Sequence, residues 1–317
     1  MPHLNFTYKS PEVSGARPVL REEIELDFGR LITAMVTPFN AVGEIHWEET
    51  ARLIDYLIVD QKSETLVVSG TTGESPTLSD AEKVQLFEFA VKHAAGRCKI
   101  IAGTGSNNTA HSIHLTKEAE RVGADGVLLV VPYYNKPSQE GMYRHFEAIA
   151  AATSLPVMLY NVPGRTVANL SAATTLRLAQ IPNIVATKEC ASMEQVTLIA
   201  AGAPDHFRVY SGDDAAGLPA IAVGAHGIVS VASHVVGAEM KQMIDAFYGG
   251  DALRATQIHQ KLFPLFKGLF ECPQPLPNPV AVKYALTLRG LNVGSVRLPL
   301  IPPTEEEQTY IENLLDM

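Results

Sequence analysis

Eight short apolar runs, each followed by a longer stretch of mixed polarity, restrict the fold of this chain more than any other feature. The first six runs are rich in Val, Ile and Leu and do not alternate with polar residues. Such runs are typical of strands covered on both faces, as in a parallel sheet. The runs begin at Leu31, Thr65, Lys99, Gly126, Val157, Ile184, Arg208 and Gly227.

The stretches between the runs carry helix signals. In the segment WEETARLIDYLI the apolar residues recur at helical spacing, which predicts one buried face. We expect that face to comprise Ala51, Ile54, Leu57 and Ile58. The segment SDAE has the Ser-x-x-Glu form of a capping box, so a helix is expected to start at Ser79.

Eight strand–helix units in roughly 220 residues match the size of a (β/α)8 TIM barrel. A doubly wound open sheet is the alternative, but no GxGxxG motif follows the first run. After about Gly250 the strand pattern stops and three helical stretches follow, interrupted by CPQPLPNP. We therefore predict an N-terminal arm at residues 1–27, a TIM barrel at 28–250 and a C-terminal helical appendage at 251–317.

Composition and charge exclude several classes of function. The 317 residues carry a formal net charge of -9, and an acidic chain repels the phosphate backbone of nucleic acids. No apolar run reaches the roughly 18 residues that a membrane span needs, and the start of the chain lacks a secretory signal. Cys98, Cys190 and Cys272 fit neither a zinc motif nor a disulfide framework. We expect a cytoplasmic protein that binds neither membrane nor nucleic acid, with its cysteines as small buried side chains.

The chemistry of a TIM barrel gathers at the carboxyl ends of its strands. Five of the runs end there in SGTTGES, PYYN, YNVPGRT, TKE and SGDD, which bring hydroxyls, phenols, a guanidinium and an ammonium together. Lys188 is the most informative of these groups, because it ends an apolar strand. Burial would lower its pKa and free a neutral amine that can form an imine with a carbonyl compound. The alternative is a strand-end lysine that extends to solvent.

Other groups at these ends have candidate roles. Arg165 follows a glycine in a loop and suits a two-point contact with a carboxylate, or else faces solvent. Thr71 and Thr72 lie between glycines, where backbone N–H groups can turn towards a carboxylate, or where the chain simply turns. Tyr134 and Tyr160 either satisfy a single hydrogen bond or pass protons through a threonine hydroxyl.

Two residue pairs are weaker candidates. His111 and His114 stand three residues apart on an expected helix, but no third ligand is evident, so we expect no metal site. Asp213 and Asp214 could act together as acid and base, although a capping Asp in a turning loop is the simpler interpretation.

The motifs GTTGES, PYYNKPSQEG, YNVPGRT, ATKE, SGDD and GAHGIVSV, in this order and spacing, resemble the dihydrodipicolinate synthase family. That family belongs to the superfamily that includes N-acetylneuraminate lyase, and the resemblance covers roughly residues 28–300. It implies a TIM-barrel lyase that condenses pyruvate with L-aspartate 4-semialdehyde, a step towards diaminopimelate and lysine. It also implies a homotetramer built from tight dimers and no metal or organic cofactor, because the lysine imine accepts the electrons.

The resemblance further implies catalytic roles for four residues. Lys188 would form the imine and Tyr160 would be the general acid and base beside it. Thr71 would relay protons between Tyr160 and Tyr134, and Tyr134 would reach into the site of a neighbouring subunit.

For substrate binding, the resemblance implies that Thr72 holds the pyruvate carboxylate together with N–H groups of its loop. Arg165 would bind the carboxylate of the second substrate, and Gly212 and Val229 would line the pocket. Thr71 and Arg165 favour the synthases, because sialic-acid lyases usually carry a serine at the first position and lack the arginine. A sugar-acid lyase and a non-catalytic binding protein on the same barrel remain the alternatives.

One departure from the family concerns regulation. Lysine-inhibited bacterial members have a histidine and a glutamate in their allosteric cleft, and the matching residues here are Lys83 and His111, while Asn107 is kept. Extra positive charge opposes binding of a cationic ligand. We therefore expect feedback inhibition by lysine to be weak or to be lost.

Overall fold

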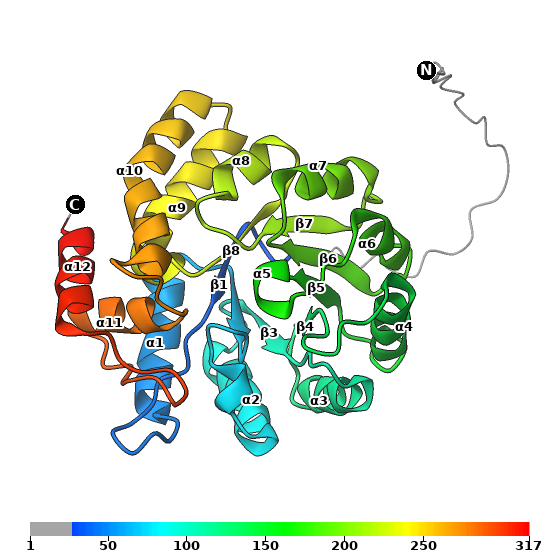
Figure 1. Ribbon diagram of the computed structural model, residues 1–317, viewed down its shortest axis with the longest axis horizontal. Helices are drawn as coiled ribbons and strands as arrows, with labels where there is room; N and C mark the ends of the chain where they lie inside the picture. The colour runs from blue at the N-terminus through cyan, green and yellow to red at the C-terminus, as the bar shows by residue number, and fades with distance from the viewer. Residues whose placement is uncertain (1–26, 317) are drawn as a thin grey trace, which may run out of the picture.

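Eight parallel strands form a closed barrel in the computed structural model, which describes residues 27–316 (Figure 1). Each strand pairs with the next and β8 pairs with β1, so the expected TIM barrel is confirmed and the open sheet is wrong. All eight strands begin at the residues where the apolar runs begin. They are β1 (Leu31–Ala34), β2 (Thr65–Val68), β3 (Lys99–Gly103), β4 (Gly126–Val130), β5 (Val157–Asn161), β6 (Ile184–Glu189), β7 (Arg208–Ser211) and β8 (Gly227–Ser230).

Helices fill the intervals between the strands and cover the outside of the barrel, except for the short α5, which lies over the centre of the barrel in Figure 1. In sequence order these are α1 (Trp47–Val59), α2 (Asp80–Ala94), α3 (Thr109–Arg121), α4 (Gln139–Ala150), α5 (Pro163–Thr166), α6 (Ala172–Leu178), α7 (Met193–Gly202), α8 (Gly217–Ala222) and α9 (Ser233–Tyr248). The capping box at the start of α2 is present as expected, with Ser79 as the N-cap. The buried face of α1 differs from the expected one, because Leu53 lies at its centre while Ala51 and Ile58 are only partly buried.

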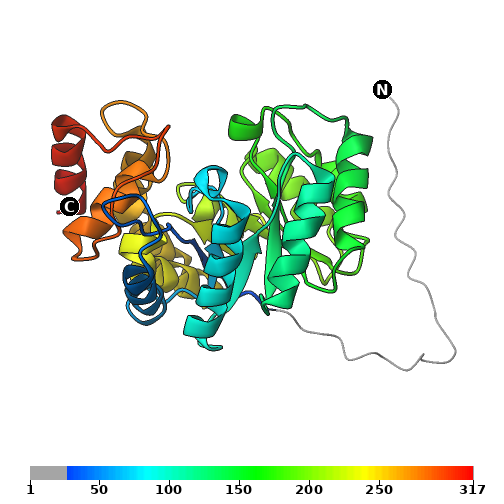
Figure 2. The same ribbon diagram turned by 90° about the horizontal axis from the view of Figure 1, so that it is seen from below.

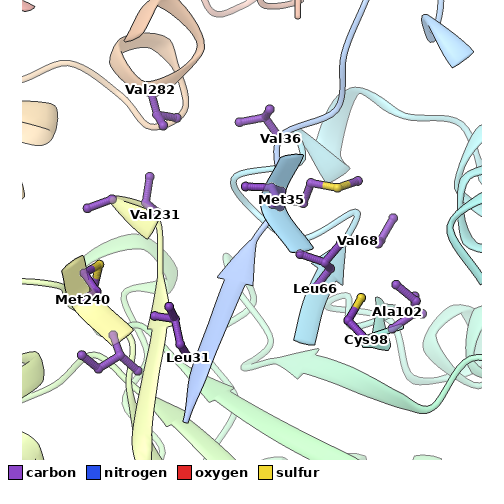
Figure 3. Close-up of a cluster of buried hydrophobic side chains, with 14 of the residues drawn as sticks. Leu31, Met35, Val36, Leu66, Val68, Cys98, Ala102, Val231, Met240 and Val282 are labelled. Carbon is purple, nitrogen blue, oxygen red and sulfur yellow. The ribbon is translucent and has the colours of Figure 1, made fainter. Parts of the chain in front are cut away.

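Two apolar clusters hold the barrel together. The inner cluster fills the barrel itself, and Phe28 closes its base, where its carbonyl accepts a hydrogen bond from the Thr65 hydroxyl (2.5 Å). The outer cluster lies between the strands and the helices, and Figure 3 shows part of it around Leu31 and Leu66. Because the inner cluster fills the centre, open space for a ligand must lie above it, at the carboxyl ends of the strands.

Three further helices lie together on one side of the barrel, beside α1 and α9 (Figures 1 and 2). They are α10 (Ala252–Glu271), α11 (Val280–Leu288) and α12 (Glu305–Leu315). The expected helical appendage is therefore present, while the domain bounds at 28, 250 and 251 stay a prediction. The expected arm before residue 27 lies outside the described residues. Within residues 27–316, no helix is both long enough and apolar enough to cross a membrane.

A buried histidine at the start of α9 makes the stability of the fold sensitive to acid. His234 is fully buried, its Nδ1–H donates to the Val231 carbonyl (2.8 Å), and its Nε2 accepts from the Val36 N–H (3.1 Å). Burial lowers the pKa of His234 to about 4, from 6.5. The unfolded chain therefore takes up this proton first as the pH falls, and stability is lost between pH 6.5 and 4.

We expect His234 to account for a loss of about 3 kcal/mol in the free energy of unfolding between pH 7.5 and pH 4. The measurement is urea unfolding of the wild type and of His234→Gln at both pH values, with His206→Gln, at an exposed histidine, as the control. His234→Gln should be less stable than wild type at pH 7.5 and lose less stability on acidification. An equal loss of stability in all three proteins contradicts the assignment.

Candidate active site

The side chain of Lys188 belongs to the inward-facing row of the barrel. Alternate residues of a strand face the same side, and Ala186, two residues earlier on β6, lies in the inner cluster. Lys188 continues that row towards the carboxyl end of the strand, opposite Tyr160 on β5. Its ammonium nitrogen lies 4.5 Å from the centre of the Tyr160 ring, and the residue is only 5% exposed. The structure thus excludes a lysine that extends to solvent.

The surroundings of Lys188 favour its neutral form. Burial lowers its pKa from the ordinary 10.5, because a charged amine loses hydration inside the barrel. The carboxylate of Asp214 and the thiol of Cys190 oppose this shift, whereas the positive charge of Arg165 adds to it. A neutral amine is the nucleophilic form, so the site prepares Lys188 to attack a carbonyl carbon.

The phenol of Tyr160 is the proton-carrying group beside this amine. Burial raises its pKa above the ordinary 10, while a hydrogen bond with the Thr71 side chain and the charge of Arg165 oppose the rise. The phenol therefore keeps its proton at neutral pH and can donate it to an oxygen that develops charge nearby. Three expected residues, Lys188, Tyr160 and Thr71, are brought together in this way.

A cavity of about 530 Å³ opens above these groups at the mouth of the barrel. Thr71 and Tyr160 line its wall, and Arg165, an exposed residue of α5, stands at its edge. The cavity extends outwards past Tyr133 towards Lys83 between the loops that follow β2, β3 and β4. Its volume suits two small keto or aldehyde acids rather than a polymer.

The remaining expected residues, like Lys188, are not among those that line this cavity, although Gly212 and Val229 were expected to do so. Gly212 follows β7 and contacts Lys188, and Val229 is fully buried in the inner cluster on β8. Thr72 is buried, and its hydroxyl accepts a hydrogen bond from the Asn278 side chain (2.9 Å), which leaves its own proton free to donate. Tyr134 is 90% exposed and does not line the cavity, so the site of this chain does not include it.

A buried polar network behind the catalytic strands is a feature that sequence reasoning missed. Glu189 faces away from the barrel interior and accepts hydrogen bonds from Asn161 (2.9 Å), Gln195 (3.0 Å) and the Ala191 N–H (2.8 Å). Asn161 and Glu189 directly follow Tyr160 and Lys188, so the network holds β5 and β6 in register just where the two reactive groups lie. Asn161 and Glu189, the polar residues that end both runs, are the feature of the sequence that indicates this network.

The structure agrees only in part with the predictions for the cysteines and for Asp213 and Asp214. Cys98 and Cys272 are buried as expected, but Cys190 is only partly buried and contributes to the charge balance at Lys188. Asp213 does cap the turn, because its carboxylate accepts from the N–H of Ala215 (2.9 Å). Asp214 instead is buried and binds backbone N–H groups that follow β8, so the pair does not act as acid and base.

Close packing makes Gly212 a sensitive position. A Cβ atom there would lie 2.8 Å from Cε of Lys188 and would overlap the sulfur of Cys190. We expect Gly212→Ala to displace the Lys188 side chain and lower kcat by about 100-fold, because a shift of an ångström at a reacting group costs this much. Steady-state kinetics would measure it, with Gly141→Ala, which meets only ordinary contacts in α4, as the control.

The same displacement predicts a partial rescue. Cys190→Ala removes the sulfur that the new methyl group meets, so the double variant should recover part of the lost kcat. Activity of Gly212→Ala within threefold of the control would show that Lys188 tolerates the contact.

Comparisons with known proteins agree with this arrangement. A family model described as the dihydrodipicolinate synthetase family matches residues 27–317. A 4-hydroxy-tetrahydrodipicolinate synthase of Bacillus subtilis is 57% identical over 292 residues, covering 92% of this chain and 99% of that protein. A crystal structure of a dihydrodipicolinate synthase from Bacillus anthracis has 53% identity and a TM-score of 0.89, covering 92% of this chain and 98% of that one. One from Cyanidioschyzon merolae, solved with lysine bound, has 44% identity and a TM-score of 0.88, covering 91% and 97%. The resemblance found in the motifs is confirmed, and this chain belongs to the dihydrodipicolinate synthetase family.

Proposed function

We propose that this chain condenses pyruvate with L-aspartate 4-semialdehyde through an imine on Lys188 and yields 4-hydroxy-tetrahydrodipicolinate. The observation that carries the proposal is an amine that is only 5% exposed, has a lowered pKa and lies 4.5 Å from the ring of Tyr160, which lines an open cavity. The curated relatives that are 52–57% identical carry the synthase name, which favours this activity over cleavage of a sugar acid.

In the first half of the reaction, Lys188 attacks the keto carbon of pyruvate. Tyr160 donates a proton to the oxygen that leaves as water, and an imine remains. Loss of a methyl proton gives the enamine, whose carbon attacks the aldehyde of the second substrate. When the methyl proton leaves, the electrons of the C–H bond move towards the protonated imine nitrogen. We therefore infer that the reaction needs neither a metal nor an organic cofactor.

In the second half, the amine of the semialdehyde attacks the imine carbon and displaces Lys188 as the ring closes. Tyr160 and Thr71 return the protons through the hydrogen bond that joins them. We assign the pyruvate carboxylate to Thr72 and the carboxylate of the semialdehyde to Arg165, whose planar fork suits a carboxylate at the cavity edge. We propose that Gly212, which packs against Lys188, and Val229 of the inner cluster shape the inner end of the site.

Tyr134 gives a reason to expect assembly. Its backbone φ of 71° is unusual for a residue with a side chain, and the exposed phenol does not line the cavity of its own chain. We propose that it completes the proton relay of a neighbouring subunit in a tight dimer, within a homotetramer. The Bacillus subtilis relative is a bacterial synthase, and we infer a cytoplasmic location for this chain.

The outer part of the cavity supports weak feedback by lysine. Lys83 lies in its wall, and the nearby carboxylate of Asp80 favours the charged form of this amine, against the lowering of its pKa by burial. His111 is bonded to Asp80 (2.9 Å), so the carboxylate that would attract a cationic ligand is already engaged. The feedback expectation stays a prediction, and sub-millimolar inhibition by lysine would contradict it.

A coupled assay tests the proposed function directly. Purified protein is given pyruvate with either L-aspartate 4-semialdehyde or a sugar-acid substrate run in the cleavage direction. Turnover of the semialdehyde alone is the expected result. Turnover of the sugar acid alone would reverse the choice of substrate, and a lack of any turnover or pyruvate adduct would indicate a binding protein.

A further inference from the structure

A buried ion pair connects the loop after β2 with the C-terminal helices. Glu74 of that loop and Lys283 of α11 are 209 residues apart in sequence, yet Oε1 and Nζ lie 2.8 Å apart with side chains only 1% and 2% exposed. The other carboxylate oxygen of Glu74 accepts from the Arg297 N–H (2.9 Å), and Lys283 also donates to the Ser295 carbonyl (2.8 Å). Burying two charges costs hydration, and these extra hydrogen bonds offset that cost.

Arg297 extends the connection to the far end of the same loop. Its guanidinium donates to the Thr77 carbonyl (2.8 Å) and pairs with Glu82 of α2. The Phe39 ring lies between the two cations, 4.2 Å from Nζ of Lys283 and 4.3 Å from the central carbon of the guanidinium. Both contacts fall within the range of cation–π attraction.

The loop held in this way has an unusual backbone. Ser69 and Glu74 have φ angles of 57° and 56°, in the left-handed region that residues with a side chain rarely adopt. Such conformations persist where surrounding contacts impose them. Thr71 and Thr72 lie between these two residues, so the contacts that fix the loop at Glu74 and Thr77 also restrict the two threonines of the site.

We propose that Glu74, Lys283 and Arg297 are positioning residues through which the C-terminal helices hold the loop of residues 69–77 in its pyruvate-binding conformation. This inference rests on the proposed function, because it assigns the pyruvate carboxylate to that loop. Apolar packing anchors α11 independently: Figure 3 shows its Val282 facing Val36 and Val231 at the carboxyl ends of the strands. Because other contacts already hold α11 in place, the ion pair can fix the loop of residues 69–77 relative to it.

The test uses a double variant, because a single change would leave one buried charge unpaired. Glu74→Gln with Lys283→Met removes both charges and keeps side chains of similar size. Arg297→Gln, at a partly exposed residue, is the milder second variant. It breaks the guanidinium contacts with Thr77, Glu82, Gly43 and the Phe39 ring and keeps the backbone N–H contact with Glu74. Tyr284→Phe is the matched control, since it removes a hydrogen bond of α11 with α12 (Tyr284 to Glu312, 2.7 Å) that does not touch the loop.

Two readouts separate positioning from simple stability. Hydrogen exchange of the backbone in residues 69–77 should become about tenfold faster in the double variant, and by a smaller factor in Arg297→Gln. The KM for pyruvate should rise about tenfold, while the KM for the semialdehyde, which meets Arg165 instead, stays within twofold. Tyr284→Phe should change neither readout, even where it lowers Tm.

The outcomes distinguish this inference from the proposed function. If hydrogen exchange in residues 69–77 is as slow in the double variant and in Arg297→Gln as in the wild type, the positioning role is overturned, whatever reaction the protein catalyses. Faster exchange together with an unchanged KM for pyruvate would overturn the link to pyruvate binding. A wild type that turns over no semialdehyde would refute the proposed function alone, because the exchange measurement still reports whether the helices hold the loop.

Discussion

Lys188→Met is expected to lower kcat by about 10⁴-fold or more, equal to about 5 kcal/mol of lost transition-state stabilisation. The amine forms the covalent bond on which every later step depends, so no other residue of the site can replace it. Lys188→Arg should be equally inactive, because a guanidinium stays protonated and does not form imines. Lys188→Met should keep the wild-type Tm within a few degrees, since removing a buried amine also removes the cost of burying it, whereas Lys188→Arg buries a permanent charge and should lower Tm.

Borohydride reduction after incubation with pyruvate locates the covalent bond. Mass spectrometry should find the adduct on Lys188 of the wild type and on no lysine of Lys188→Met. Lys283 serves as an internal control, because it is equally buried but bonded to Glu74. Since burial lowers the pKa of Lys188, the rate of trapping should rise with pH and reach its plateau below pH 10.5, the ordinary pKa of a lysine amine. An adduct on another lysine would refute the assignment.

Tyr160→Phe should lower kcat by about 1,000-fold, with a much smaller effect on the KM for pyruvate. The phenol has a raised pKa and a hydrogen bond to Thr71, so it holds a proton where water must leave. Phenylalanine keeps the ring that packs against Lys188 and removes only the donor. Steady-state kinetics should therefore show a loss confined to the chemical steps.

Tyr210 provides a matched control for this substitution. It lies on the other side of Lys188, on β7, but its hydroxyl donates to the Gly29 carbonyl (3.0 Å) at the base of the barrel. Tyr210→Phe should keep kcat within threefold of the wild type. Equal losses in the two variants would mean that the barrel needs both rings for its structure, and that Tyr160 has no special role in proton transfer.

The strands could be predicted from the sequence because each one is a local property of the chain. Runs such as VMLYN and IVATKE have the β-branched and apolar residues that a doubly covered strand requires, and every strand begins where its run begins. Ser79 likewise indicates the start of α2, because its capping contact is with Glu82, only three residues along the chain. The buried face of α1 also follows helical spacing, through Thr50, Leu53, Ile54 and Leu57, but it includes the polar Thr50 in place of Ala51, which apolar periodicity does not indicate.

The site could be predicted only as a set of residue types at strand ends. Which groups meet depends on the closure of the barrel, and the motifs of the family supplied that information for Lys188, Tyr160 and Thr71. The contact between Glu74 and Lys283 joins residues more than 200 positions apart, and no local pattern indicates it. The tight packing of Gly212 against Lys188 is equally invisible in the sequence, because it depends on the register of β6 and β7.

The aromatic plug at Phe28 sets the direction in which the chain enters the barrel. The polypeptide joins β1 from the base, and the cavity opens beyond the other ends of the strands, about 17 Å away for a strand of five residues. A fusion partner or a surface tether joined directly to Asp27, in place of residues 1–26, would therefore start at the face remote from substrate entry. Immobilising the protein through Asp27 should keep its catalytic opening accessible.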